Sequence, residues 1–243
     1  MSVMVRRHPF GWHGALRHVN ESVKRHGFAT GLRISVQRVR RLAYCYETQV
    51  WYHLRLDAPR PRLHLPASLT LVKVGRRDWH FVHQLPNVAS EDAARRLAAG
   101  RDLWVVHDRG RVLFASWIVR LRMEAISTRD IDFALPDRAV GLDDAIGAPA
   151  VLGRGIATAA WSQMADAICE DGMTAIISKV GETDLAGRRA MELAGFRAVA
   201  SVELQRVGRH YWVDVRPYEQ GGLASHLAAH LPARGEIAVR PVA

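Results

Sequence analysis

The alternation of apolar and polar residues predicts strands through the middle and C-terminal parts of the chain. Residues 44–56 alternate aromatic and β-branched side chains with polar ones, which is typical of a half-buried strand. Further strands are predicted at 69–74, 102–107, 111–119, 131–135, 139–147, 174–180, 198–205 and 210–215. Strands 102–107 and 111–119 form the plainest hairpin, because only Asp108-Arg109-Gly110 separates them.

Helical spacing appears between these strands. Residues 155–171 repeat apolar side chains at helical positions, residues 184–194 form a second helix closed by Gly195, and Ser90 is the expected N-cap of a helix that ends at Gly100. Residues 8–40 are weakly helical, and so is the tail up to Leu231. Prolines 59, 61 and 66 indicate a linker, so we expect an extension at 1–65, a domain at 66–218 and a tail at 219–243.

Composition fits a globular protein of the reducing cytoplasm. The chain is 49% hydrophobic and 24% charged, and it holds two distant cysteines, expected as free thiols. It has no apolar run of 18 residues and no secretory signal at its start, so we expect neither a membrane span nor export.

The net charge of +10 is concentrated in the first quarter of the chain. Residues 1–65 hold twelve Arg or Lys and three acidic residues, with a cluster at Arg38, Arg40 and Arg41. Such a field attracts nucleic acid, anionic lipid, CoA phosphates or an acidic carrier protein. The alternative is a solvated basic face without a partner.

The segment between the strand at 139–147 and the helix at 155–171 has the chemistry of an anion site. Gly153 and Gly155 flank Arg154, and a long helix begins at once. A helix N-terminus offers unpaired N–H groups and about half a positive charge, and glycines let a phosphate approach the backbone. Ordinary strand-to-helix turns also favour glycine, which is the alternative for this loop taken alone.

Two segments together resemble the GCN5-related N-acetyltransferase (GNAT) superfamily. Pro149-Ala150-Val151-Leu152-Gly153-Arg154-Gly155-Ile156-Ala157 resembles its acyl-CoA signature, and the segment Asp184–Phe196, ending in Gly195-Phe196, is similar to its second CoA-side helix. The resemblance covers residues 69–217. It implies an α/β fold with a mixed, mostly antiparallel central sheet flanked by helices, here with an N-terminal helical and strand extension. It also implies an acyl-CoA-dependent N-acyltransferase that uses acetyl-CoA, or another acyl-CoA, on a small-molecule or peptide amine.

The resemblance further implies which residues form the site. The cofactor-binding residues expected from it are Ile146, Gly147, Ala148, Leu152, Gly153, Arg154, Gly155, Ile156, Ala157, Thr158, Asp184 and Gly187. Leu152 stands where the family usually has Arg or Gln, and Met191 where many members have the tyrosine that protonates the leaving thiolate.

A general base must take the proton of the acceptor. The candidates are Asp143, Asp144, Glu203 and Glu124, and Asp143 or Asp144 is favoured because carboxylates on this strand point toward the expected acceptor cleft. Strand alternation lets at most one of the two do so.

Other chemistry is weakly represented. His80 and His83, and His226 and His230, lack the further ligands that a metal site needs, so no metal is expected. Two other functions stay open: transfer of a longer acyl chain from CoA or from an acidic acyl-carrier protein docked on the basic extension, and a binding or regulatory protein that has kept the fold without catalysis. A homodimer is also open.

Overall fold

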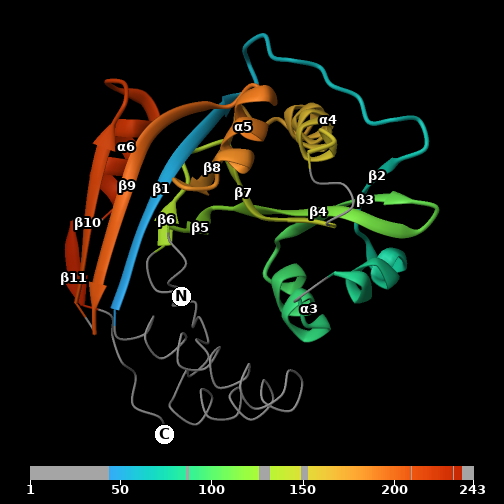
Figure 1. The fold of residues 1–243 in the computed structure, drawn as a ribbon, viewed down its shortest axis with the longest axis horizontal. Coiled ribbons are helices and arrows are strands. Elements are labelled where there is room, and N and C mark those ends of the chain that lie inside the picture. The colour runs from blue at the N-terminus through green and yellow to red at the C-terminus, as the bar shows by residue number, and fades with distance from the viewer. Residues whose placement is uncertain are drawn as a thin grey trace, which may run out of the picture. The chain divides into compact units, whose positions relative to one another are not determined.

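The computed structural model describes residues 44–85, 88–125, 132–148, 153–208, 210–231 and 233–236 (Figure 1). The chain divides into two compact units. The larger comprises Thr48–Glu203 with Asp214–Leu231, and the described part of the smaller comprises residues 44–47, 204–208, 210–213 and 233–236.

A mixed, mostly antiparallel sheet forms the centre of the larger unit. Its strands are β1 (Tyr44–Arg55), β2 (Thr70–Lys73), β3 (Asp102–Asp108), β4 (Arg111–Arg120), β7 (Ala139–Gly147), β8 (Ala175–Gly181), β9 (Arg197–Val207) and β10 (His210–Pro217). They lie in the order β10-β9-β1-β8-β7-β4-β3-β2. Strands β7 and β8 run parallel, whereas β1–β8, β4–β7, β3–β4 and β2–β3 are antiparallel. The fold class predicted from the sequence is confirmed.

Helices cover both faces of this sheet, and strand β4 explains why. Its alternate residues Phe114 and Ile118 pack in one core with Trp161 of α4 (Ile156–Glu170), beside which lies α5 (Leu185–Leu193). The residues between them, including Ala115 and Trp117, pack in a second core with η1 (Arg76–Gln84), a 3₁₀ helix, and α3 (Ser90–Ala98). Helices α4 and α5 therefore lie on one side of β4 and β7, and α3 on the other (Figure 1).

A small second layer covers part of β1. Strands β5 (Arg122–Glu124) and β6 (Asp132–Ala134) form a separate two-stranded sheet, and α6 (Gly222–His230) packs beside it. Phe133 of β6 meets Trp51 edge-on at a ring distance of 5.2 Å and His226 of α6 at 5.3 Å. Trp51 is consequently fully buried.

Strand β1 belongs to the central sheet, although the sequence places it in the extension at 1–65. From Gln49 to Arg55 it pairs with β8, and its other neighbour is β9. The proline-rich segment after it, predicted as a linker, crosses α4 (Figure 1). Ser162 of α4 donates a hydrogen bond to the carbonyl of Pro61 and accepts one from the N–H of Leu63, both at 2.9 Å. The boundary at residue 65 stays a prediction.

The described part of the smaller unit is built on strand ends. There β10 pairs antiparallel with β11 (Arg234–Glu236), from His210 opposite Glu236 to Trp212 opposite Arg234. The sequence did not indicate β11, β5 or η1, and the helix expected from Ser90 has Ala89 as its N-cap instead. The Ser90 hydroxyl is hydrogen-bonded to Nδ1 of His83 at 3.1 Å. In the described part of the chain, no helix has the length and apolar character needed to span a membrane.

Candidate functional site

The two parallel strands part in the middle of the sheet. Pairing between β7 and β8 runs from Ala139 opposite Ala175 to Leu142 opposite Ser178 and goes no further, although both strands continue. The hydroxyl of Ser178 donates to the carbonyl of Leu142 at 3.1 Å at this point. Strand β7 stays paired with β4 as far as Gly147. Beyond Leu142, the edge of β7 that faces β8 therefore offers backbone N–H and C=O groups to another molecule.

Helix α4 begins with the glycine loop. Gly153 and Gly155 adopt left-handed φ of 76° and 73°, and Gly155 is the N-cap of the helix. This conformation strains residues with a Cβ, and a Cβ built on either glycine meets no atom within 4 Å. The 15-residue helix therefore begins directly after this loop, with Arg154 exposed between the glycines. Leu152 lies outside the described residues.

The expected cofactor residues at the start of α4 and the end of β7 are buried or half-buried. Ile156 and Thr158 are buried, and the Thr158 hydroxyl reaches the carbonyl of Ala190 in α5 at 3.5 Å, so these two join α4 to the core. Ala157 is half-buried. Ile146 and Ala148 line a groove of about 270 Å³ beside η1 with Gln84, Leu85, Arg111, Val112 and Leu113, and Gly147 lies between them in the chain.

Asp184 and Gly187 form the cap of α5. The Asp184 carboxylate accepts a hydrogen bond from the N–H of Gly187 at 2.9 Å, the usual N-cap arrangement. A Cβ on residue 187 would stand 2.4 Å from Asp184 Oδ2, which explains the glycine. Met191, on the same helix, is buried in the core and carries no dissociable proton.

A β-bulge places two carboxylates where the parallel strands part. Ser116 of β4 faces Ala145 and Trp117 faces Asp143, so Asp144 is the extra residue, with φ of 41°. The bulge breaks the alternation on which the separation of Asp143 from Asp144 was predicted. Positive φ in a residue other than glycine costs about 1–3 kcal/mol, and such strain is often kept at functional positions.

Asp143 is the more buried of the two, with 11% of its side chain exposed against 50% for Asp144. Burial raises the pKa of Asp143, and the negative charges of Asp144 and Glu124 add to this. The cations Lys179 and Arg101 act in the opposite direction but do not cancel the effect. A carboxylate with a raised pKa next to an opening in a sheet is suited to act as a general base.

Three cations surround these carboxylates. Arg101, just before β3, reaches Asp143 at 3.4 Å and Glu124 of β5 at 3.5 Å. Arg96 of α3 contacts Asp144 at 2.5 Å and lies 5.3 Å from the Trp117 ring. Lys179 lies one residue past the last position of β8 that is paired with β7, and its ammonium donates to the carbonyl of Glu124.

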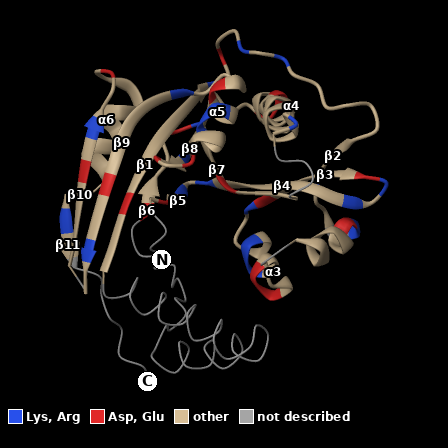
Figure 2. Cartoon of the chain, viewed as in Figure 1, with Lys and Arg blue, Asp and Glu red and all other residues tan. Residues whose placement is uncertain are grey.

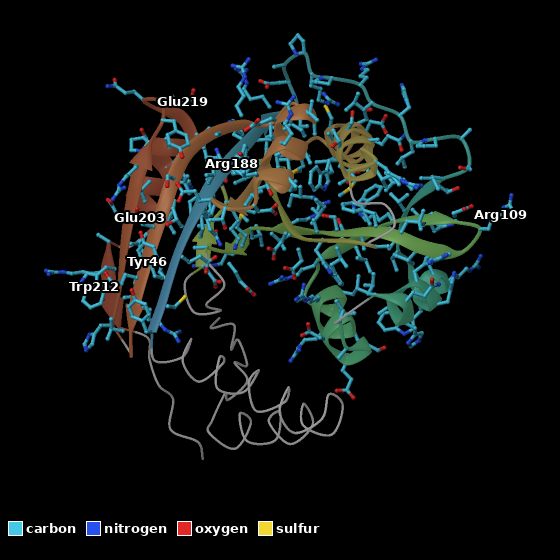
Figure 3. The ribbon with its side chains drawn as sticks, in the orientation of Figure 1. Tyr46, Arg109, Arg188, Glu203, Trp212 and Glu219 are labelled. Atoms are coloured by element: carbon cyan, nitrogen blue, oxygen red, sulfur yellow. The ribbon has the colours of Figure 1, made fainter. Side chains whose placement is uncertain are left out.

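Asp143, Asp144 and Glu124 were expected from the sequence, whereas the three cations were not. Each cation comes from a separate element, so no spacing along the chain could have joined them. The structure does not bring Glu203 into this cluster. It lies on β9, three strand positions from β7, or about 14 Å at ordinary strand spacing, and pairs with Arg216 at 3.0 Å (Figure 3).

Two other expectations fall outside this cluster. Arg38, Arg40 and Arg41 of the basic extension lie outside the described residues. Among the residues that the structure does describe, no group of three His, Cys, Asp or Glu side chains is arranged to hold a metal ion.

No protein-family model matches the chain, and no curated protein matches it in sequence. Solved structures match it in fold, with low identity. A GCN5-related N-acetyltransferase from Sphaerobacter thermophilus has 15% identity and a TM-score of 0.48 over 82% of this chain and 59% of that one. A GNAT-family acetyltransferase from Colwellia psychrerythraea has 13% identity and a TM-score of 0.48 over 81% and 72%.

A third match is a protein from Novosphingobium aromaticivorans described as a GNAT-family acetyltransferase, with 16% identity and a TM-score of 0.46. The match covers 66% of this chain and 65% of that one. The chain thus spans less than two thirds of the Novosphingobium and Sphaerobacter proteins. It is similar in fold to GCN5-related N-acetyltransferases, the family that its two sequence signatures resemble.

Proposed function

We propose that the protein is a GCN5-related N-acyltransferase that transfers an acyl group, with acetyl as the first expectation, from CoA to an amine. The observation that carries the proposal is the parting of β7 and β8 after Leu142 and Ser178, with a buried carboxylate of raised pKa as the next residue of β7. An opening between parallel strands admits a linear thioester, and the carboxylate beside it can accept the proton of an amine.

The residues present fit the CoA phosphates at the start of α4. The N–H groups at Gly153–Ala157 and the positive end of the helix dipole would hold the pyrophosphate, with Arg154 close by. The open space beside Gly153 and Gly155 leaves room for phosphate oxygens close to the backbone. The exposed N–H groups of β7 beyond Leu142 would hold amide and carbonyl oxygens farther along the molecule.

In this mechanism CoA supplies an activated acyl carbonyl, and the protein supplies position and a base. Asp143 accepts a proton from the amine as the nitrogen–carbon bond forms and the carbon–sulfur bond breaks. An N–H group of β7 stabilises the negative charge on the carbonyl oxygen. Because Met191 has no proton to give, the leaving thiolate takes its proton from another acid or from solvent.

The first test measures binding by thermal shift, with CoA, acetyl-CoA and longer acyl-CoAs as ligands. The wild-type protein should be stabilised, and Gly155→Glu should abolish the shift because a carboxylate would occupy the phosphate position. Gly172→Glu is the matched control, since Gly172 ends the same helix with φ of 81° and equal open space. Absence of a wild-type shift with every acyl-CoA at millimolar concentration would refute the proposal.

The second test separates the two aspartates. Asp143→Asn should lower turnover at least about tenfold near neutral pH with little change in acyl-CoA affinity. Asp144→Asn should have a clearly smaller effect, because Asp144 is half exposed and paired with Arg96. Equal and trivial effects of the two substitutions would remove the base role from Asp143.

A further inference from the structure

The charged cluster where β7 and β8 separate is nearly balanced in sign. Its carboxylates are Asp143, Asp144 and Glu124, and its cations are Arg96, Arg101 and Lys179. Helix α3 also carries both signs, with two acidic residues in its first turn and two arginines in its last (Figure 2). A site for a polyamine would carry an excess of acid, and a site for a polyanion an excess of base. With Asp92, which also pairs with Arg96, there are four carboxylates to three cations, so neither sign is in large excess.

Arg101 is the cation that can change partners. Its contacts of 3.4 Å with Asp143 and 3.5 Å with Glu124 exceed the 2.7–2.9 Å or so of strong charge-assisted hydrogen bonds. Its planar fork would bind a carboxylate more closely. Arg96 differs, because it holds Asp144 at 2.5 Å and Asp92 at 3.2 Å and also lies over Trp117.

A molecule with an amine beside a carboxylate fits this arrangement. Its carboxylate would take the guanidinium fork of Arg101, and its amine would then lie next to Asp143, which Arg101 touches. On an α-amino acid both groups are attached to one carbon, which suits two protein groups in direct contact. A monoamine has no carboxylate to bind Arg101, so its amine would have to compete with Arg101 for Asp143.

We infer, given the proposed acyl transfer, that the acceptor is a free α-amino acid or a molecule with the same pairing of amine and carboxylate, and that Arg101 selects it. The positive charge of Arg101 lowers the pKa of Asp143. When the acceptor's carboxylate neutralises Arg101, Asp143 becomes a stronger base. Acceptor binding would therefore activate the residue that removes the acceptor's proton.

The test compares the common L-amino acids with their carboxamides and with spermidine as acceptors, measuring thiol release from acetyl-CoA. We expect the protein to acetylate at least one of the amino acids. The carboxamide of that amino acid should have a kcat/KM roughly a hundredfold lower, because it lacks the charge that Arg101 binds. Arg101→Gln should remove this difference, chiefly by raising KM for the amino acid, and Arg101→Lys should restore part of it. The control Arg95→Gln, on the exposed side of α3, should leave kcat/KM unchanged for both the amino acid and its carboxamide.

Several outcomes would overturn the inference. These are equal use of carboxamides or spermidine, or an equal effect of Arg101→Gln on both kinds of acceptor. Calorimetry of amino acids with the CoA-saturated protein supplies a second readout: absence of binding there also overturns it, whatever the rates. Failure of the proposed function appears differently, as absence of any acyl-CoA binding by the wild-type protein.

Discussion

Removal of strand β1 should abolish folding of the domain predicted at 66–218. A chain of residues 66–243 lacks Val50, Trp51, Tyr52 and Leu54, each at most 2% exposed. Burial of one such side chain stabilises a fold by about 1.5–3 kcal/mol, so their loss removes about 6–12 kcal/mol. Whole domains are stable by only about 5–15 kcal/mol. The truncation also leaves β8 without its seven paired residues on that side, from Gln49 to Arg55.

The assay is urea and thermal denaturation of two truncated chains, followed by circular dichroism and tryptophan fluorescence. Residues 66–243 should show no cooperative transition, whereas residues 44–243 should, because they keep every contact of β1 described above. A peptide of residues 44–65 added to the shorter chain should restore a transition in proportion to its concentration. A cooperative transition of residues 66–243 alone, with a midpoint close to that of the full chain, would refute the assignment of β1 to the core.

Three smaller perturbations follow from individual contacts. Because burial raises the pKa of Asp143, kcat/KM should rise with pH over a range above the ordinary aspartate pKa of 3.8. The free energy of unfolding should fall as pH rises through the same range, because the folded state binds the proton more tightly than the unfolded state. Asp143→Asn should remove both dependences, as measured by pH–rate profiles and by urea denaturation at a series of pH values. Ser162→Ala should cost about 1–3 kcal/mol in urea denaturation, because the N–H of Leu63 and the carbonyl of Pro61 lose their partner; an unchanged midpoint would show that the proline segment does not stabilise α4. Gly187→Ala should cost about 1–2 kcal/mol, and a further Asp184→Ala should then have little effect, since the first change already breaks the cap.

The sequence was sufficient for elements that bury one face and carry their own end signals. The helix at α4 and the hairpin of β3 and β4 fall within a residue or two of their predicted bounds, because period and turn residues lie within each segment. The place of β1 in the sheet was not predictable, because its partner β8 lies far along the chain. The prolines after β1 indicated a change of direction but could not show that the segment packs on α4.

The site was partly predictable for a similar reason. Asp143 and Asp144 were proposed as alternatives from their strand, because carboxylates there are expected to point toward the acceptor cleft. The bulge at Asp144 was not foreseen, because no glycine stands there and an aspartate, although it tolerates positive φ, does not by itself indicate a bulge. Arg101 and Lys179 are single cations in segments without periodicity, and only the fold brings them to Asp143.

The place of β1 also sets the order in which the protein can be assembled. It is the first described strand to leave the ribosome, yet its partners in β8 come 120 to 132 residues later. The segment Tyr44–Arg55 contains three tyrosines and a tryptophan. Until β8 has been synthesised, this segment cannot form its pairing with β8. Contacts so distant in sequence form slowly, and unpaired apolar strands associate with one another while they wait. Yield on expression should therefore depend on how well this one segment is shielded during synthesis.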